Sequence, residues 1–425
     1  MLVLWCFKLK AQEVLTLQQA IEIALKNNYD ITIARNEALI TDNNATLGNA
    51  GALPRFDFIL NQNNSILDSK QNYSNGTEVN KTGAKGHNLN AVVQLTWTLF
   101  DGFTMFASYN KLQELSALGN LNAKAVIESS VNDVINNYYE VLRMKALIRV
   151  TQNALDVSQV KLRIAKTKFE IGSTSKSEYL QAEIDRNADS SSLLQQQQIL
   201  DNSKVRLNEL LARDADTAFD IDTVFSIDLA INYDDLKTKA INENTSLLIA
   251  DKNVNISKYY LKELKGDRYP RIGVTGSYDY NKSNTEASFI LDNRTQGFNY
   301  GFNISYNLFN GFNLNREIKN ARIINDNAMV NYTAAKADLL SQLKIGYRIY
   351  ANNVQLMNLE QNNSMLANEN LSLAMERFRA GTIDELRLKD AQQSNVEAQN
   401  RLVNSKFVAK LSEVYLKRIS GQLLQ

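Results

Sequence analysis

Few residues in this sequence could carry out covalent or metal chemistry. The 425-residue chain contains one cysteine, Cys6, and one histidine, His87. Disulfides within the chain, cysteine-cluster metal sites and histidine-based catalytic triads are therefore excluded. Carboxylates are plentiful, at 46 acidic against 47 basic residues, but no sequence motif indicates that two of them form a catalytic pair in a cleft. We find neither a Walker loop nor a dinucleotide fingerprint. The sequence predicts a protein that is not an enzyme and has no metal or cofactor.

The balance of charge excludes a further class of partner. The formal net charge is +1, and no broad basic field exists that would attract nucleic acid. The chain has only two prolines, Pro54 and Pro270, so long uninterrupted helices are permitted over most of its length. No apolar run approaches the roughly 18 residues of a membrane-spanning helix. Any crossing of a membrane is therefore expected to be made by strands.

Two near-identical pentapeptides organise the chain, Leu99 to Phe103 (LFDGF) and Leu308 to Phe312 (LFNGF). Each closes a stretch with strand-like alternation and opens a stretch with helical spacing. Gly102 and Gly311 allow positive φ, and the preceding Asp or Asn can cap the next helix. Asp-Gly and Asn-Gly also favour hairpin turns. About sixty residues without proline follow each turn, which indicates a helix rather than a returning strand.

The two pentapeptides belong to a repeat that runs through the whole chain. Pro54-Arg55 matches Pro270-Arg271 at an offset of 216 residues, and the pentapeptides match at an offset of 209. Pro54, Pro270, Gly102 and Gly311 are expected at junctions between helices and strands. The predicted organisation is a first repeat over 13–213, a linker over 214–232 and a second repeat over 233–421. The acidic residues of the linker are expected to be solvated and are assigned no site.

The helical segments carry heptad spacing, which favours coiled coils. Seven apolar residues of the first long helix are spaced seven apart without a gap, and the second has one polar break at Ser364. We expect a first helix over 16–50, a long helix over 103–170 and another over 175–212, with counterparts in the second repeat. The first series is Ile127, Val134, Val141, Ile148, Leu155, Leu162 and Phe169.

Four alternating segments predict strands of about ten residues with one apolar and one polar face. They are expected at 55–60, 90–99, 271–280 and up to Leu308, with polar loops over 61–88 and 281–297. Four strands cannot close a barrel, and free sheet edges are not viable in lipid. Three chains would supply twelve strands, enough for a barrel with a wet lumen. The alternative is a soluble sheet packed on helices of the same chain.

The N-terminal segment 1–12 has a short apolar run from Leu2 to Phe7. It is similar to the end of a secretory signal whose basic start is missing. A disordered start is the alternative. Cys6 is a less favoured lipid-anchor site, because the bulky Trp5 precedes it where lipoprotein signals usually carry a small residue.

Taken together, these motifs resemble the TolC family of outer-membrane efflux and secretion channels, over essentially the whole chain after residue 14. The resemblance rests on the opening Leu15-Thr-Leu-Gln-Gln-Ala, the paired Pro-Arg, the paired pentapeptides, and Phe169-Glu-Ile-Gly172 with Phe378-Arg-Ala-Gly381. It implies a mixed α and transmembrane β fold: a homotrimer whose shared twelve-stranded β-barrel, four strands per chain, lies in outer-membrane lipid. A long α-helical coiled-coil barrel would continue across the periplasm.

The resemblance also implies a gate at the periplasmic tip, where Gly172 and Gly381 would mark helix-to-helix turns. A periplasmic adaptor protein and an inner-membrane pump would open it. The implied tip and adaptor contacts are Gly172, Gly381, Phe169, Phe378 and Thr382. The implied pore and gate residues are Asp390, Glu178, Asp384, Glu385 and Arg387.

Local explanations compete with a gate role for these acids. Ser175 with Glu178, and Thr382 with Glu385, both fit a capping box. Asp390 could pair with Arg387 one turn back. Ile383 stands where the family pattern expects an arginine, and Arg387 where it expects an aspartate, so the family's salt-bridge latch is not reproduced here. The competing function is a soluble coiled-coil scaffold.

Overall fold

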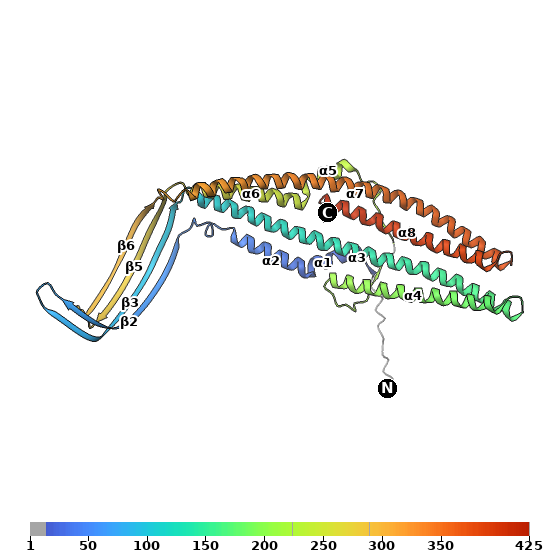
Figure 1. Cartoon of the computed structure of the whole chain (residues 1–425), viewed down its shortest axis with the longest axis horizontal. Helices are drawn as coiled ribbons and strands as arrows, with labels where there is room; N and C mark the ends of the chain where they lie inside the picture. Colours follow the sequence, from blue (N-terminus) through green and yellow to red (C-terminus); the bar gives the residue numbers. More distant parts are fainter. Residues whose placement is uncertain (1–13, 223, 289, 425) are drawn as a thin grey trace, which may run out of the picture. The chain divides into compact units, whose positions relative to one another are not determined.

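The computed structural model describes residues 14–222, 224–288 and 290–424, so the predicted signal segment 1–12 lies outside the described residues (Figure 1). The chain divides into two compact units. One unit comprises residues up to 37 together with 120–249 and 333–425, and it is helical apart from two very short strands. The other comprises 38–119 and 250–332, and it contains the main β-sheet.

Long helices of matched length demonstrate the internal repeat. Helix α3 (Thr104–Glu170) and helix α7 (Asn313–Arg379) have 67 residues each. Helix α4 (Lys176–Leu210) and helix α8 (Glu385–Ile419) have 35 residues each. Both pairs begin and end at positions 209 residues apart, which is the offset read from the pentapeptides. The prediction of two structural repeats with long helices is confirmed.

The predicted first helix over 16–50 is wrong in detail, because it is two helices. Helix α1 (Leu17–Asn27) stops at Asn28, and helix α2 (Tyr29–Asn44) follows directly. Asn28 has extended backbone angles; its side-chain oxygen accepts from the Ile31 amide, and its side-chain nitrogen donates to the Leu210 carbonyl at 3.0 Å. One asparagine thus caps a new helix and also satisfies the C-terminal carbonyl of α4.

The second repeat uses the same device between helix α5 (Tyr233–Glu243) and helix α6 (Thr245–Gly266). Asn244 accepts from the Leu247 amide and donates to the Ile419 carbonyl at 2.9 Å, at the end of α8. The helix break is therefore a property of each repeat.

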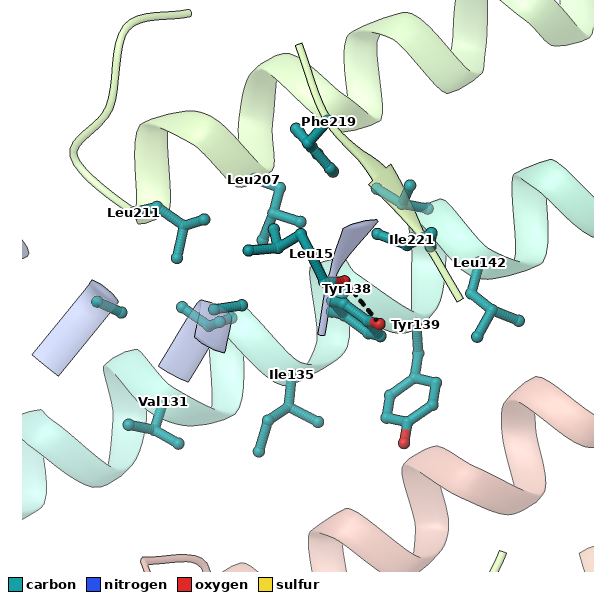
Figure 2. Close-up of a cluster of buried hydrophobic side chains, with 14 of the residues drawn as sticks. Leu15, Val131, Ile135, Tyr138, Tyr139, Leu142, Leu207, Leu211, Phe219 and Ile221 are labelled. Atoms are coloured by element: carbon teal, nitrogen blue, oxygen red, sulfur yellow. Dashed lines mark hydrogen bonds between the residues drawn. The ribbon is translucent and has the colours of Figure 1, made fainter. Parts of the chain in front are cut away.

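A compact apolar core holds the first repeat together (Figure 2). Strand β1 (Val14–Leu15) pairs in parallel with strand β4 (Asp220–Ile221), which lies in the segment predicted as a linker. The phenol of Tyr138 on α3 donates to the Leu15 carbonyl, as Figure 2 shows. Fully buried members of this core include Val131, Val134, Val141, Leu207 and Leu211.

The main sheet is a four-stranded antiparallel array in the order β2-β3-β5-β6. Its strands are β2 (Arg55–Asn72), β3 (Glu78–Phe100), β5 (Arg271–Thr285) and β6 (Asp292–Ser305). They are longer than the predicted ten residues, and most of the predicted loops 61–88 and 281–297 belongs to strands. Polar composition suggested loops, but inter-strand hydrogen bonds decide the outcome. The last strand ends at Ser305 rather than Leu308.

The pairing register confirms that the sheet has one apolar and one polar face. Phe58 pairs with Val93, Val93 with Tyr278, and Tyr278 with Phe298, so these four residues share a face. The adjacent row, Asp57, Gln94, Ser277 and Asn299, lies on the opposite face. Aromatic residues on the apolar face are largely exposed in the single chain, as for a surface that meets lipid.

Both pentapeptides form the predicted strand-to-helix turn. Gly102 and Gly311 have φ of 73° and 67°, and the phenylalanine after each also has positive φ. Asp101 accepts a hydrogen bond from the Met105 amide at 2.8 Å, as expected of a cap. A register shift between Thr98 and Phe100 places a β-bulge at Leu99.

Among the described residues, no helix combines the length and the apolar character that are needed to cross a bilayer.

Candidate gate at the helical hairpin turns

Helices α3 and α4 form one helical hairpin, and helices α7 and α8 form the other. The two hairpins turn with the same backbone geometry. Gly172 and Gly381 both have φ of 73°. The Gly172 amide donates to the Phe169 carbonyl and the Ser173 amide to the Lys168 carbonyl. Gly381 and Thr382 repeat these two bonds to Phe378 and Arg377. This is the glycine-terminated helix end that satisfies the last carbonyls, and it places the turns where the sequence predicted them.

Aromatic residues brace the turns in different ways. Phe169 stacks on Tyr179 of α4 with ring centroids 5.7 Å apart, which tightens the first hairpin. Phe378 is buried, and the ammonium of Lys168 lies 5.1 Å from its ring centroid. This cation–π contact connects the end of α3 with the end of α7. Both predicted tip aromatics therefore have structural contacts.

Neither predicted capping box forms in full, although the first hairpin keeps the serine cap. The Ser175 hydroxyl caps α4 by accepting from the Glu178 amide at 3.2 Å, and the Glu178 carboxylate accepts from the Thr174 hydroxyl. The predicted capping box of Thr382 with Glu385 is wrong. Asp384 caps α8, accepting from the Arg387 amide at 2.9 Å, and the Thr382 hydroxyl donates to the Arg377 carbonyl. An aspartate one residue before Glu385 is the stronger cap.

Glu385 instead joins a charge network centred on Lys161. The Lys161 side chain is only 1% exposed, and its ammonium lies 2.7 Å from both Asp185 of α4 and Glu385 of α8. The Asp185 contact is a hydrogen bond. The Glu385 contact is an ion pair without hydrogen-bond geometry, since that carboxylate oxygen accepts no hydrogen bond. One buried cation therefore connects α3, α4 and α8.

A second cation and a neutral cluster extend this connection. Lys389 of α8 lies 3.0 Å from the other oxygen of Asp185. One turn further along, the Gln392 amide donates to the Ala154 carbonyl and to the Ser158 hydroxyl, which itself donates to Asp189. Three successive turns of α8 are thus held to the α3–α4 hairpin by polar contacts. We call the residues Lys161, Asp185, Glu385 and Lys389 the buried charge network.

The buried charge network favours the ionised form of Asp185. Partial burial by itself would raise the pKa of this carboxyl, but hydrogen bonds from Lys161, Lys389 and Gln181 outweigh burial and lower it below its usual value of 3.8. Asp185 is therefore a carboxylate at every physiological pH. Opening the contact between the α3–α4 hairpin and α8 would separate these charges.

Asp390, Arg387 and Asp384 remain exposed on α8 and the turn before it. No ion pair joins Asp390 to Arg387 in the part of the chain that the structure describes, so the local explanation for Asp390 is not supported. Glu178 is exposed as well.

Sequence reasoning identified Glu385 but missed Lys161, Asp185 and Lys389. A signal for Lys161 was present. The residues Leu147, Thr151, Ala154, Ser158, Lys161 and Ala165 repeat at spacings of four and three and are all buried. This stripe lies beside the apolar heptad series and carries small and polar residues, as a seam with polar contacts would.

Comparison with solved structures defines the fold as that of an outer-membrane channel. VceC of Vibrio cholerae is 18% identical, with a TM-score of 0.76 over 95% of this chain and 96% of that one. The CmeC outer membrane channel of Campylobacter jejuni is 16% identical, with a TM-score of 0.79 over 96% and 86%. The outer-membrane channel OprN is 15% identical, with a TM-score of 0.78 over 96% and 90%. No curated protein matches the chain.

The sequence itself gives the family. A model of the outer membrane efflux protein family matches residues 20–213 and 236–422. The chain belongs to this family, and the predicted TolC-family membership is confirmed. The protein is an outer-membrane channel that extends into the periplasm, and members of the family are trimers that work with pump partners. A soluble scaffold is not the function of this class of protein.

Proposed function

We propose that this channel is the exit duct of a tripartite efflux pump or of a type I secretion system. A periplasmic adaptor protein contacts its hairpin turns, and an inner-membrane pump supplies the energy. The observation that carries the proposal is the buried charge network, which holds α8 to the α3–α4 hairpin by contacts that can separate. Polar contacts suit a reversible latch. Once separated, charged groups are stabilised by water, whereas an apolar seam that opens exposes hydrophobic surface to water at a cost in free energy.

In the proposed mechanism the closed duct is held by Lys161 and opened by movement of α7 and α8. Adaptor binding at the turns around Gly172 and Gly381 supplies the free energy that separates Lys161 from Glu385 and Lys389 from Asp185. A ligand shifts such an equilibrium only by its differential affinity for the two states. The adaptor must therefore contact surfaces that are arranged differently in the open duct, which the exposed turns provide.

Deletion of the protein tests the function directly. A strain without it is expected to become more sensitive to several organic drugs if it serves a tripartite pump. If it serves type I secretion, the strain is expected to retain one polypeptide that is normally exported. The chain has 7 methionines and 1 histidine, few ligands for a metal-ion pathway, so organic solutes are the favoured cargo. Unchanged drug susceptibility and unchanged secretion would contradict the proposal.

Asp390 is proposed as the pore-facing acid of the gate. Three copies around the axis would repel each other and attract cations. Asp390→Asn is expected to lower the cation selectivity of the purified channel in planar bilayers and to weaken block by multivalent cations at least several-fold. Asp326→Asn, on α7 far along the sequence from the turns, is the control. Equal selectivity and block in Asp390→Asn and the parent channel would remove Asp390 from the gate.

A further inference from the structure

Helices α7 and α8 run side by side in their hairpin (Figure 1), and a pocket of about 240 Å³ lies between them. Two turns before the pocket along α7 the helices are in close contact, because a Cβ added at Gly346 would lie 2.8 Å from the ring of Tyr415. Asn353 and Glu360 follow Gly346 at intervals of seven residues, and both line the pocket. Opposite them, α8 contributes the small side chain of Ser405, which leaves the space between the helices unfilled.

The pocket contains a buried hydrogen-bond donor that has no acceptor. Asn353 is 9% exposed, and its side-chain nitrogen has no hydrogen-bond partner among the residues that the structure describes. An unsatisfied buried polar group costs free energy, and such groups are rare in native structures. Because Asn353 lines the pocket, a molecule bound there can supply the missing acceptor.

The neighbouring polar side chains also offer donors rather than acceptors. The Asn404 side-chain oxygen accepts from the Arg143 guanidinium at 2.9 Å, which fixes the orientation of this amide and leaves its nitrogen available. The Arg401 Nε donates to Glu360 at 3.2 Å, and this pair balances the charge of the pocket. The Glu360 carboxylate also accepts from Asn363. A ligand therefore gains more from an acceptor group than from a donor, and a neutral ligand suits the paired charges better than an ion does.

Apolar side chains form the rest of the wall. Leu356 of α7 and Val408 of α8 line the pocket and are 44% and 46% exposed. An engineered protein cavity of about 150 Å³ admits benzene, so this larger pocket accommodates one ring with a short substituent.

We propose that this pocket binds a small neutral molecule that carries an apolar ring and a carbonyl group. The carbonyl oxygen accepts a hydrogen bond from Asn353, and the ring packs on Leu356 and Val408. A water molecule would satisfy Asn353 alone, whereas this ligand also covers the two apolar side chains. The inference goes beyond the proposed duct, because both walls of the pocket belong to one hairpin of one chain.

Acetophenone, which has one carbonyl acceptor and no donor, is the probe. Its binding to the purified full-length channel in detergent is measured by a ligand-observed NMR titration, and saturable binding is expected. Asn353→Leu removes the donor and should weaken binding about tenfold. Val408→Phe should abolish binding by filling the pocket. The matched controls are Asn352→Leu and Leu359→Phe, both exposed on α7, and they should bind acetophenone like the parent.

A reversal of polarity separates ligand recognition from a purely structural role of Asn353. Asn353→Asp has nearly the same shape, but its carboxylate presents acceptors only. This variant should lose acetophenone and bind benzylamine, whose ammonium group is a donor, about tenfold more tightly than the parent does. Acetophenone that binds equally to the parent and to Val408→Phe has entered only the micelle, and the inference is then wrong. Unchanged affinities in both Asn353 variants would overturn it as well.

Discussion

Replacing Lys161 with methionine is expected to give a channel that leaks at rest. Methionine fills much of the same space but leaves Asp185 and Glu385 without their shared cation. Removing one partner of a buried ion pair costs about 3–5 kcal/mol. We expect about 3 kcal/mol here, because Asp185 retains Lys389 and Gln181. In the proposed latch this loss falls on the closed state, so resting conductance and uptake of large antibiotics should rise more than tenfold.

The matched control for this prediction is Lys166→Met. Lys166 lies on the same helix and its ammonium is 4.0 Å from Glu170, but both side chains are about 60% exposed. Surface pairs of this kind contribute little, so the control should conduct like the parent. Single-channel recordings of the two variants in planar bilayers make the comparison. A Lys161→Met channel as tightly closed as Lys166→Met would show that the buried charge network is structural packing and not a latch.

The same network predicts how closure depends on pH. The folded-state pKa of Asp185 is lowered, so its contribution to the closed state is present above the unfolded value near 3.8. That contribution is lost as the pH falls below 3.8 through the folded value. Resting conductance should therefore be flat at neutral pH and rise only under strongly acidic conditions. Asp185→Asn should abolish the part of this rise that comes from the network.

Replacing Glu413 with alanine is expected to detach the linker between the repeats, residues 214–232, from α8. The Glu413 side chain is 1% exposed. Its carboxylate accepts hydrogen bonds from the ammonium groups of Lys410 at 2.9 Å and Lys417 at 2.8 Å, and from the Asp228 amide at 3.0 Å. Alanine removes the acceptor of the Asp228 amide and of the Lys410 ammonium, and it leaves Lys417 only its longer contact with the Asp228 carboxylate, at 3.9 Å. By the usual cost of breaking a buried charge network, about 3–5 kcal/mol of stability should be lost.

Proteolysis and thermal unfolding measure this effect. Glu413→Ala should become sensitive to cleavage near Asp228, with a lower unfolding temperature for the trimer. The tyrosines beside this site sense the same environment: burial first, and then the charge of Glu413, raise the pKa of both Tyr139 and Tyr350 to about 12. Removing Glu413 should lower both values. Glu397→Ala, exposed on the same helix, should change neither stability nor cleavage, and an unaltered cleavage pattern in Glu413→Ala would refute the anchoring role.

Local sequence determined the elements and their repetition, because turns, helix periodicity and strand alternation depend on neighbouring residues. The pentapeptides placed the two strand-to-helix turns, Gly172 and Gly381 placed the hairpin turns, and the heptad series predicted the long helices. The alternation of Phe58, Val93 and Tyr278 predicted the apolar face of the sheet. Predictions based on polarity alone were weaker. Asn-rich stretches that suggested loops form the halves of β2 and β3 that adjoin the turn between these two strands.

Only the tertiary structure decided which side chains meet across distant helices. Lys161, Asp185 and Glu385 are far apart in sequence. The four-and-three spacing places Lys161 on a stripe of small and polar residues, but it does not tell which carboxylates of other helices cover that stripe. The acidic linker gave no hint that the Asp228 amide would donate to the buried Glu413 carboxylate, or that Asp220 and Ile221 would pair with Val14 and Leu15. Periodicity fixes the face of a helix on which a residue lies, but the burial of a charge depends on which element covers that face, and that is set by packing between segments separated by hundreds of residues.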